Sequence, residues 1–417
     1  MREMKDSGIE WIGQIPKGWE LRRAKTLFTQ RNSKGNGIEV LLSPTQKYGV
    51  VPQSQLEGVV QVKEDTDLQM FKTIHKGDFV ISLRSFQGGF EYSLYEGVCS
   101  PAYQVFYPTS PICDTYYRYL FKSQSFISKM NNLTVGIREG KNIQYVDFAN
   151  SQIPVPPLAE QERIAAFLDA ECAEIDTVLE KPRASIEEYK KLKQAVITQA
   201  VTKGIRGDRP MKNSGIEWIG DIPAEWSLVP FSKFARVSAN LVNPSDYQDY
   251  LQVSPENIEK DSGKLLPCKT VSEVGVESWN HFFHKGQILY SKIRPKLNKV
   301  CIAPFDGLCS ADMYPIDTDN ISKFVVYTIL SNDFNQQVAM ITENRVKMPK
   351  INQKELSKII VVLPANRMEQ QEIVDYLDGE CGKIDSLIAK KQQYLTEIEN
   401  YKKSLIYEYV TGKKEVV

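Results

Sequence analysis

The chain carries the same short segment twice, at an offset of 207 residues. Eleven residues of Met4–Pro16 are identical in Met211–Pro223, and the tryptophan three positions further on recurs as well. A second repeat, at an offset of 209 residues, relates Glu160–Asp176 to Glu369–Asp385. Two copies of one module therefore fill the chain, and we expect a chain built in this way to act in two related halves.

Size and composition predict a cytoplasmic protein with more than one core. A chain of 417 residues is too long for a single hydrophobic core. No apolar run is long enough to span a membrane, and the first residues lack the apolar stretch of a signal peptide. Seven cysteines without a Cys-x-x-Cys pair argue against a disulfide framework and for a reducing compartment.

The formal net charge is zero, so a DNA partner would have to be bound through local basic patches. Residues 14–157 contain 16 Lys and Arg against 12 Asp and Glu, whereas residues 221–364 contain 16 of each. A basic field over the whole protein is therefore excluded as the source of affinity.

Each half ends with a proline stop that is followed by a long charged segment. The stops are Ile153–Pro157 and Val361–Pro364, and prolines at these places allow a helix to begin only after them. We therefore predict a first mixed region with its lead-in at 1–157, a long helix at 158–210, a second mixed region at 211–364 and a second long helix at 365–417.

Apolar residues spaced three, four and seven apart predict one narrow seam on each long helix. About 45 residues of helix would extend roughly 65 Å, too far for either mixed region to cover, so we predict that the two helices pack on each other. Pro182 lies inside the first helix, where we expect a kink or a restart. The residues predicted to pack between the helices are Leu168, Ile175, Leu179, Ile186, Leu192 and Val196 in the first and Leu377, Ile384, Ile388, Leu395, Ile398 and Leu405 in the second.

The two mixed regions are predicted to be α+β domains. Asp78–Leu83 and Gln287–Ser291 are aromatic and β-branched runs next to Lys-Gly turns, typical of strands. Thr115–Met130 and Ile321–Met340 have the spacing of helices. The expected fold is two similar α+β domains joined by two long helices, in an internal repeat.

No catalytic motif is recognisable in the sequence. Asn243–Tyr247 approaches the Asn-Pro-Pro-aromatic motif of DNA methyltransferases but lacks the second proline, so we interpret it as a turn. No Gly-x-x-x-x-Gly-Lys-Ser/Thr loop for ATP is present. His281 and His284 have a zinc-compatible spacing, but no Cys or carboxylate cluster completes a ligand set, and a structural role is favoured. We predict no enzyme activity, no metal and no cofactor for this chain.

Two loops in each half combine Arg and Lys with Asn and Gln, which suit phosphates and base edges. Charged loops are often merely solvated, but their equivalent places in both halves favour a binding role. The candidate DNA-binding residues are Arg84, Gln87, Arg138, Lys141 and Asn142 in the first half and Lys292, Arg294, Lys296, Arg345, Lys347 and Lys350 in the second.

Together these features resemble the specificity subunit of type I restriction-modification systems. The resemblance rests on the Gly-x-Ile-Pro-x-x-Trp lead-ins, Gly13–Trp19 and Gly220–Trp226, and on the Glu-Gln pairs that follow each proline stop at Glu160 and Glu369. It covers essentially the whole chain.

The resemblance implies that each mixed region is a target-recognition domain for one half of a split DNA sequence. It also implies that the long helices form an antiparallel coiled coil that fixes the spacing of the domains. In that family the subunit is not catalytic. Two modification subunits bind it and methylate adenine with S-adenosylmethionine, and restriction subunits add ATP-dependent translocation and cleavage. Neither cofactor is then expected on this chain.

Two other hypotheses remain open from the residues alone. The chain could be a self-contained DNA-modifying enzyme with an unrecognised site, or a coiled-coil scaffold without a nucleic-acid role. Binding of S-adenosylmethionine to the isolated chain would support the enzyme hypothesis. A complex that protects no DNA in footprinting would support the scaffold hypothesis.

Overall fold

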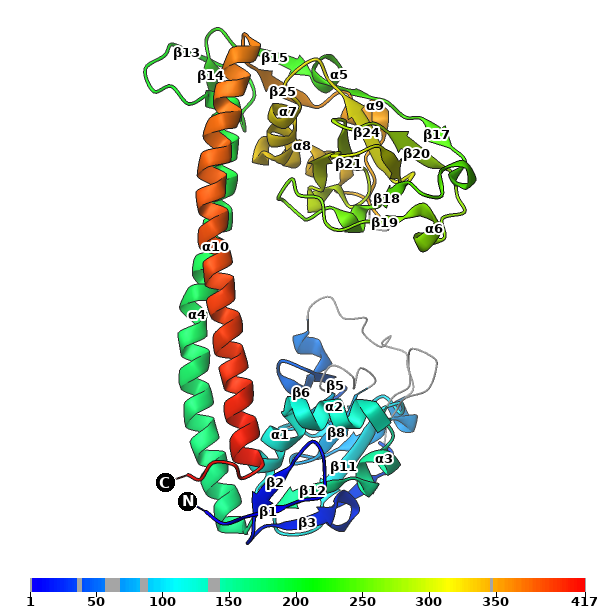
Figure 1. Ribbon diagram of the computed structural model, residues 1–417, viewed down its shortest axis with the longest axis vertical. Coiled ribbons are helices and arrows are strands. Elements are labelled where there is room, and N and C mark those ends of the chain that lie inside the picture. Colours follow the sequence, from blue (N-terminus) through cyan, green and yellow to red (C-terminus); the bar gives the residue numbers. More distant parts are fainter. Residues whose placement is uncertain are drawn as a thin grey trace. The chain divides into compact units, whose positions relative to one another are not determined.

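The computed structural model describes residues 2–35, 40–56, 68–82, 89–133, 143–345 and 348–416. The chain divides into two compact units. Unit 1 comprises Met1–Pro182 with Gln393–Val417, and unit 2 comprises Arg183–Gln392. The division falls within both long helices, α4 (Leu158–Lys203) and α10 (Arg367–Val410), which Figure 1 labels. Each unit therefore contains one mixed domain, the start of one long helix and the end of the other.

In unit 1 the mixed domain is built on an antiparallel four-stranded sheet in the order β4-β11-β8-β9. Its core is aromatic: Phe106 lies 4.5 Å from Phe148 and 5.4 Å from Phe79, measured between ring centroids. The strands of unit 1 are β1 (Met4–Asp6), β2 (Gln14–Pro16), β3 (Glu20–Arg23), β4 (Phe28–Arg31), β5 (Leu42–Thr45), β6 (Gly49–Pro52), β7 (Lys72–Ile74), β8 (Phe79–Ile81), β9 (Phe90–Tyr92), β10 (Gly97–Cys99), β11 (Gln104–Pro108) and β12 (Gln152–Val155). Its shorter helices are α1 (Asp114–Lys122), α2 (Gln124–Leu133) and α3 (Tyr145–Asn150).

Unit 2 repeats this sheet as β16-β24-β21-β22, again antiparallel, and adds a five-stranded sheet in the order β17-β20-β23-β18-β19. The strands are β13 (Met211–Asn213), β14 (Asp221–Pro223), β15 (Ser227–Pro230), β16 (Arg236–Val237), β17 (Leu241–Val242), β18 (Leu251–Val253), β19 (Lys269–Thr270), β20 (Asn280–Phe283), β21 (Ile288–Ser291), β22 (Val300–Ile302), β23 (Gly307–Cys309), β24 (Met313–Asp317) and β25 (Ile360–Leu363). The shorter helices are α5 (Phe231–Phe234), α6 (Val271–Val274), α7 (Ser322–Leu330), α8 (Asn332–Thr342) and α9 (Gln353–Leu356).

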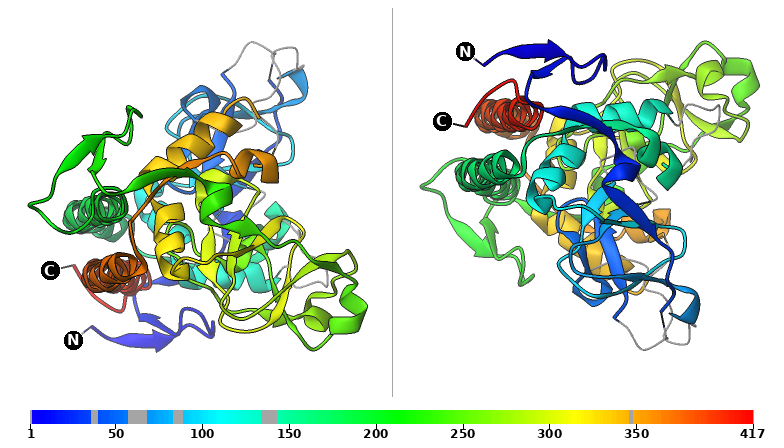
Figure 2. Two further views of the ribbon diagram at one scale, coloured as in Figure 1. Left: turned by 90° about the horizontal axis from the view of Figure 1, so that it is seen from above. Right: turned by 90° about the horizontal axis from the view of Figure 1, so that it is seen from below.

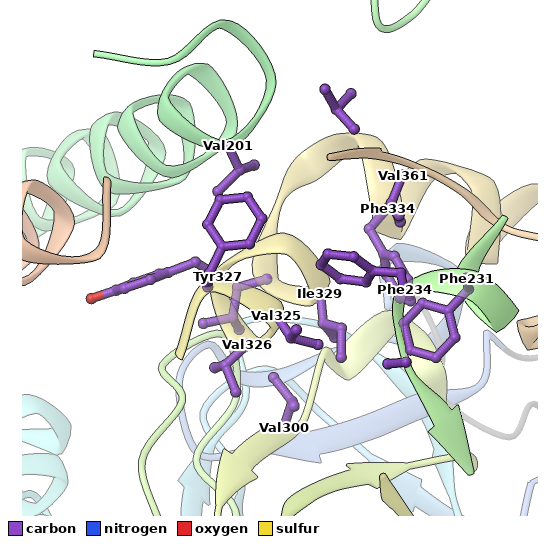
Figure 3. Packing of buried hydrophobic residues seen from close by; sticks show 14 of the residues in the cluster. Val201, Phe231, Phe234, Val300, Val325, Val326, Tyr327, Ile329, Phe334 and Val361 are labelled. Carbon is purple, nitrogen blue, oxygen red and sulfur yellow. The ribbon is translucent and has the colours of Figure 1, made fainter. Parts of the chain in front are cut away.

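The main core of unit 2 lies between α4, α7, α8 and the four-stranded sheet. Figure 3 shows Val201 of α4 on one side of this core and a group of phenylalanines on the other. In that group, Phe231 lies 5.8 Å from Phe334 and 6.2 Å from Phe234. The end of the long helix thus belongs to the same core as the mixed domain.

Both units have the predicted α+β composition, and the predicted fold class is confirmed. The predicted strands correspond to β8 and β21. Each predicted shorter helix is in fact two helices, broken at Ser123 and Ser331, where the backbone is extended. Among the described residues, no helix combines the length and the apolar character needed to cross a membrane.

Within each unit the two long helices pack in antiparallel orientation. In unit 1, Phe167 lies 4.4 Å from Tyr409 between ring centroids, and Lys402 donates to Asp176 at 2.6 Å. In unit 2, the Lys391 ammonium lies 5.8 Å from the Tyr189 ring, and Lys193 donates to Asp385 at 2.7 Å. In both units, residues with higher numbers in α4 contact residues with lower numbers in α10. The two helices therefore run antiparallel.

Most of the predicted seam residues are buried or half-buried, but Leu192 is not. Its side chain is 48% exposed, and Ile197 is fully buried in its place. Near the end of α4, Ile197 and Val201 pack into the core of the mixed domain. The buried face of α4 therefore turns toward that core. The predicted seam assumed contact with the partner helix alone and so did not include this turn.

Pro182 does not divide the first helix. α4 is one continuous element across this residue, so of the predicted kink or restart the restart is wrong and the kink stays a prediction. Proline removes one backbone N–H, the donor that would otherwise bond four residues back, but the helix keeps its other bonds. Leu179 before it and Ile186 after it are both buried, so packing on either side holds the helical path.

Substitution of two glycines in unit 2 by alanine should change the stability in opposite directions. A Cβ at Gly307 of β23 would lie 2.6 Å from the Leu251 carbonyl oxygen, whereas a Cβ at Gly379 of α10 meets nothing within 4 Å. We expect Gly307→Ala to lower the free energy of unfolding by about 1–3 kcal/mol through overpacking. Gly379→Ala should raise it by roughly 0.5–1 kcal/mol through helix propensity. Urea titration followed by circular dichroism measures both, and a shift of the same sign would contradict this packing.

Candidate nucleic-acid interface

The candidate residues of the first half lie outside the described residues. Arg84, Gln87, Arg138, Lys141 and Asn142 belong to 83–88 and 134–142, and Lys347 of the second half also falls outside. Their role in DNA binding therefore stays a prediction. The other five candidates are described, and all belong to unit 2.

The two candidate loops of unit 2 lie side by side. The first follows β21 and the second precedes α9. They are connected by an isolated β-bridge between Ile293 and Lys350. The Arg294 amide donates to the Pro349 carbonyl at 2.8 Å, and the Ile351 amide donates to the Lys292 carbonyl at 3.0 Å. Two basic segments more than 50 residues apart in sequence thus form one surface.

The backbone of this paired loop is held in an unusual conformation. Arg294, Asn298 and Met348 have φ values of 45°, 47° and 48°, in the left-handed region that residues with a Cβ rarely adopt. Such conformations persist only where the surroundings hold them, and they concentrate at functional sites. Asn298 is buried and donates to the Leu330 carbonyl at 3.2 Å, which fixes the end of the first loop.

Several of the candidate cations are engaged within the protein. Arg345 forms a two-pronged ion pair with Glu355, and Lys350 pairs with Asp312 at 2.9 Å. The Lys292 ammonium lies 5.2 Å from the Tyr314 ring. These contacts shape the loops, and the sequence did not indicate them.

Arg294 and Lys296 differ from these three. Both side chains are exposed, and neither has a partner among the residues that the structure describes. They stand on the strained first loop, beside the buried Pro295. An unpaired cation on a rigid backbone is suited to meet a phosphate or a guanine edge.

A basic groove adjoins this loop in unit 2, with a volume of about 850 Å³. Lys193 and Lys264 reach the same carboxylate there, Asp385, at 2.7 and 3.2 Å. Burial opposes the charge on Asp385, but the two lysines hold its pKa below the ordinary value. The charged residues that line the groove are six lysines, Lys190, Lys191, Lys193, Lys260, Lys264 and Lys296, and four carboxylates, Glu187, Glu259, Asp261 and Asp385. Sequence reasoning missed it, although three lysines within four residues of α4 were a visible signal.

The histidine pair has no described ligand set around it. His281 is buried in β20, where burial lowers its pKa and Lys292 lowers it further. His284 is exposed and packs edge-on to Phe282, with 5.0 Å between the ring centroids. Within the described ranges, no group of three or more His, Cys, Asp or Glu side chains is placed to hold a metal ion.

Comparison with known proteins identifies the family. The sequence model described as "Type I restriction modification DNA specificity domain" matches residues 16–188 and 236–400, one match in each half. The chain belongs to this family. The resemblance inferred from the lead-ins and the Glu-Gln pairs is thereby confirmed.

Individual relatives agree with this assignment. The specificity subunit of the type I restriction enzyme EcoDI from Escherichia coli is 32% identical over 347 residues, which cover 78% of this chain and 76% of the relative. The putative type I restriction enzyme MjaX specificity subunit from Methanocaldococcus jannaschii is 25% identical, over 97% of this chain and 96% of the relative. A solved structure on the structural basis of complex assembly and conformational transition of the type I R-M system is 16% identical in sequence to this chain. The match covers 96% of this chain and 99% of the chain in that structure, with a TM-score of 0.63. That likeness supports the fold.

The repeated residues of this type I specificity chain attach each target domain to the start of its long helix. In unit 1 the Trp19 indole donates to Glu160 at 2.8 Å, and the Arg2 guanidinium donates to the other oxygen of Glu160 at 2.5 Å. The same guanidinium lies over the Trp19 ring, 5.2 Å from its centroid.

Unit 2 contains the same cluster. Trp226 donates to Glu369 at 2.9 Å, Arg209 donates to the other oxygen of Glu369 at 2.6 Å, and Arg209 lies 5.2 Å from the Trp226 ring. The next residue, Gln370, accepts from the Ile321 amide at 3.1 Å, as Gln161 of unit 1 does from the Cys113 amide at 2.9 Å. The repeated tryptophans and glutamates that carry the family resemblance therefore have a structural role. They attach each recognition domain to its long helix.

Removing the buried carboxylate of unit 2 should be strongly destabilising. The side chains of Arg209 and Glu369 are only 8% and 7% exposed, so Glu369→Ala leaves a buried cation with only the exposed Glu225 as a carboxylate partner, and a buried indole without its acceptor. The expected loss is about 3–5 kcal/mol in the free energy of unfolding. Glu372→Ala is the matched control, because Glu372 pairs with Arg206 at the surface and should contribute at most about 1 kcal/mol. Equal losses in thermal or urea unfolding would contradict an anchoring role for Glu369.

Proposed function

We propose that this chain is the sequence-specificity subunit of a type I restriction-modification complex. Each unit reads one half of a bipartite double-stranded DNA target. The paired helices set the spacing of the two domains and dock two modification subunits, which supply the methyl-transfer chemistry. Restriction subunits join the same assembly. The chain itself is not catalytic, and S-adenosylmethionine and ATP are bound by its partners.

The observation that carries this proposal is the contrast between anchors and loops. The Arg–Trp–Glu cluster is the same in both units, whereas the basic loops differ in sequence between the halves. A common attachment with different reading surfaces suits recognition of two unlike half-sites. Membership in the specificity family supports the same conclusion.

Reconstitution tests the proposal as a whole. Purified modification subunits should methylate a bipartite sequence only when this chain is added, with the methylated adenines mapped by sequencing. Methylation of the same sequence without the chain would refute the role in specificity. Heat on titrating S-adenosylmethionine into the isolated chain would favour the self-contained enzyme instead, and a complex that protects no DNA would favour the scaffold.

Within the target, we propose that unit 2 reads through Arg294 and holds phosphate through Lys296. Their exposure, their lack of a described partner and the strained backbone beneath them support this assignment. The lysine groove continues this surface, and its exposed Lys191 provides a further phosphate contact. Arg345 and Lys350, tied to Glu355 and Asp312, are proposed to support the loop and to contact DNA secondarily. In unit 1, the corresponding roles are proposed for Arg84, Gln87, Arg138, Lys141 and Asn142.

The two cations of the loop should behave differently when removed. Arg294→Ala should cost about 1–3 kcal/mol of discrimination at one base pair of one half-site and leave the other half-site unchanged. Lys296→Ala should weaken binding to all sequences and reduce the slope of log affinity against log salt by about one. Arg236→Ala, an exposed arginine on β16, is the control for Arg294→Ala. Binding of the assembled complex to half-site variants measures both effects, and relaxation of both half-sites would contradict the assignment.

A further inference from the structure

The identical lead-in segments form the same hairpin in both units. β1 pairs with β2 in unit 1, and β13 pairs with β14 in unit 2, in the same register. In each tip the first serine amide donates to a glycine carbonyl at 3.0 Å, from Ser7 to Gly13 and from Ser214 to Gly220. In unit 2 the hairpin lies beside the long helices, on the side away from the four-stranded sheet, as Figures 1 and 2 show.

Most of the identities in the hairpin have a structural cause. The isoleucines Ile12 and Ile219 are buried, as are Ile15 and Ile222. The serine hydroxyl of each tip accepts an amide two residues further on, at 3.1 Å in both copies. The glycines at both ends of each tip have positive φ, near 70°, which favours glycine.

Glu10 and Trp11, with their counterparts Glu217 and Trp218, are not explained in this way. Both glutamates are exposed and have no partner among the described residues. Trp218 is 39% exposed and lines an open groove of about 690 Å³ with residues of α4 and the start of α8. Trp11 rests edge-on against Phe126 at 5.7 Å and also lines a groove, of about 580 Å³.

Other exposed positions of the same hairpin differ between the copies. Gln14 corresponds to Asp221, and Lys17 corresponds to Ala224, all four exposed. The hairpin surface therefore accepts change at some of its exposed positions. An exposed glutamate beside a tryptophan that lines a groove, the same in both copies, points to a ligand that is the same in both copies.

We infer that the Glu-Trp tip of each hairpin is a docking surface for the modification subunit, one subunit on each unit. This inference rests on the proposed function. The two half-sites of a bipartite target differ, so DNA would meet different residues in the two units, whereas two copies of one protein meet identical residues.

Charge favours a protein partner over nucleic acid at this surface. The exposed carboxylates of Glu10 and Glu217 would repel a phosphate backbone. Tryptophan is enriched among the residues that contribute most to protein–protein affinity, where it fills an apolar pocket. The complementary surface on the modification subunit therefore presents an apolar pocket for the indole beside a basic group for the carboxylate.

The test compares two charge reversals four residues apart in the assembled complex. Glu217→Lys reverses the proposed contact, and Asp221→Lys makes the same change of charge at an exposed position that differs between the copies. Native mass spectrometry of the full chain with modification subunits should show two subunits for the natural chain and for Asp221→Lys, but one for Glu217→Lys. The double variant Glu10→Lys with Glu217→Lys should hold none. Titration should give affinity weaker by roughly 10- to 100-fold at each altered site.

Each alternative has its own outcome. If the natural chain binds no modification subunit, the proposed function fails. If the natural chain binds two subunits and Glu217→Lys and Trp218→Ala also bind two with unchanged affinity, the docking inference alone is overturned. A Glu217→Lys complex that keeps both subunits but loses DNA would assign the tip to nucleic acid, and a change in self-association of the isolated chain would assign it to a second copy. Unchanged thermal unfolding of Glu217→Lys verifies that the variant folds.

Discussion

The structure of each unit depends on one carboxylate, half-buried in unit 1 and buried in unit 2, that has its hydrogen-bond partners in place. Glu160 and Glu369 each accept one hydrogen bond from an indole and one from an arginine that also covers that indole. A buried charge is costly unless it is paired and hydrogen-bonded, so the cluster is stable only when lead-in and helix start come together. The end of the other long helix joins the same point: a Cβ at Gly412 would lie 2.9 Å from the Trp19 ring. Three separate segments of the chain are thereby held at one place.

This arrangement separates attachment from recognition. The residues of the cluster lie in the repeated segments, so the mixed domain between them is free to change its loops without loosening its connection to the helices. The repeated four-stranded sheet follows the same logic, since β4-β11-β8-β9 and β16-β24-β21-β22 have the same order although few of their residues agree. Cys99 and Cys309 mark equivalent strands, and both are fully buried free thiols whose pKa is raised by burial. They fill core space in both copies.

The sequence predicted those features that depend on local pattern. The repeat, the proline stops and the apolar spacing predicted two modules, two long helices and the family. It could not predict features that depend on which segments meet. Leu192 fits the heptad spacing, yet Ile197 is buried instead because the core of the mixed domain lies beside the end of α4. Pro182 has a local cost, yet α4 continues across it between the buried Leu179 and Ile186. The candidate loops of unit 2 were chosen separately, and only their bridge from Ile293 to Lys350 reveals one surface.

The same limit explains how a chain of zero net charge can present the proposed DNA-binding surface. Counting charges treats every lysine alike, whereas the structure divides them into two groups. Lys193, Lys264 and Lys350 are each paired with a carboxylate, which neutralises them and stiffens the groove and the loop. Arg294 and Lys296 lie on that stiffened frame without a described partner. Because the backbone of this loop is already fixed, with Arg294 and Asn298 in the left-handed region on either side of a short helical turn, little loop ordering remains to oppose binding. The proposed DNA contact of unit 2 therefore rests on local arrangement and not on total charge.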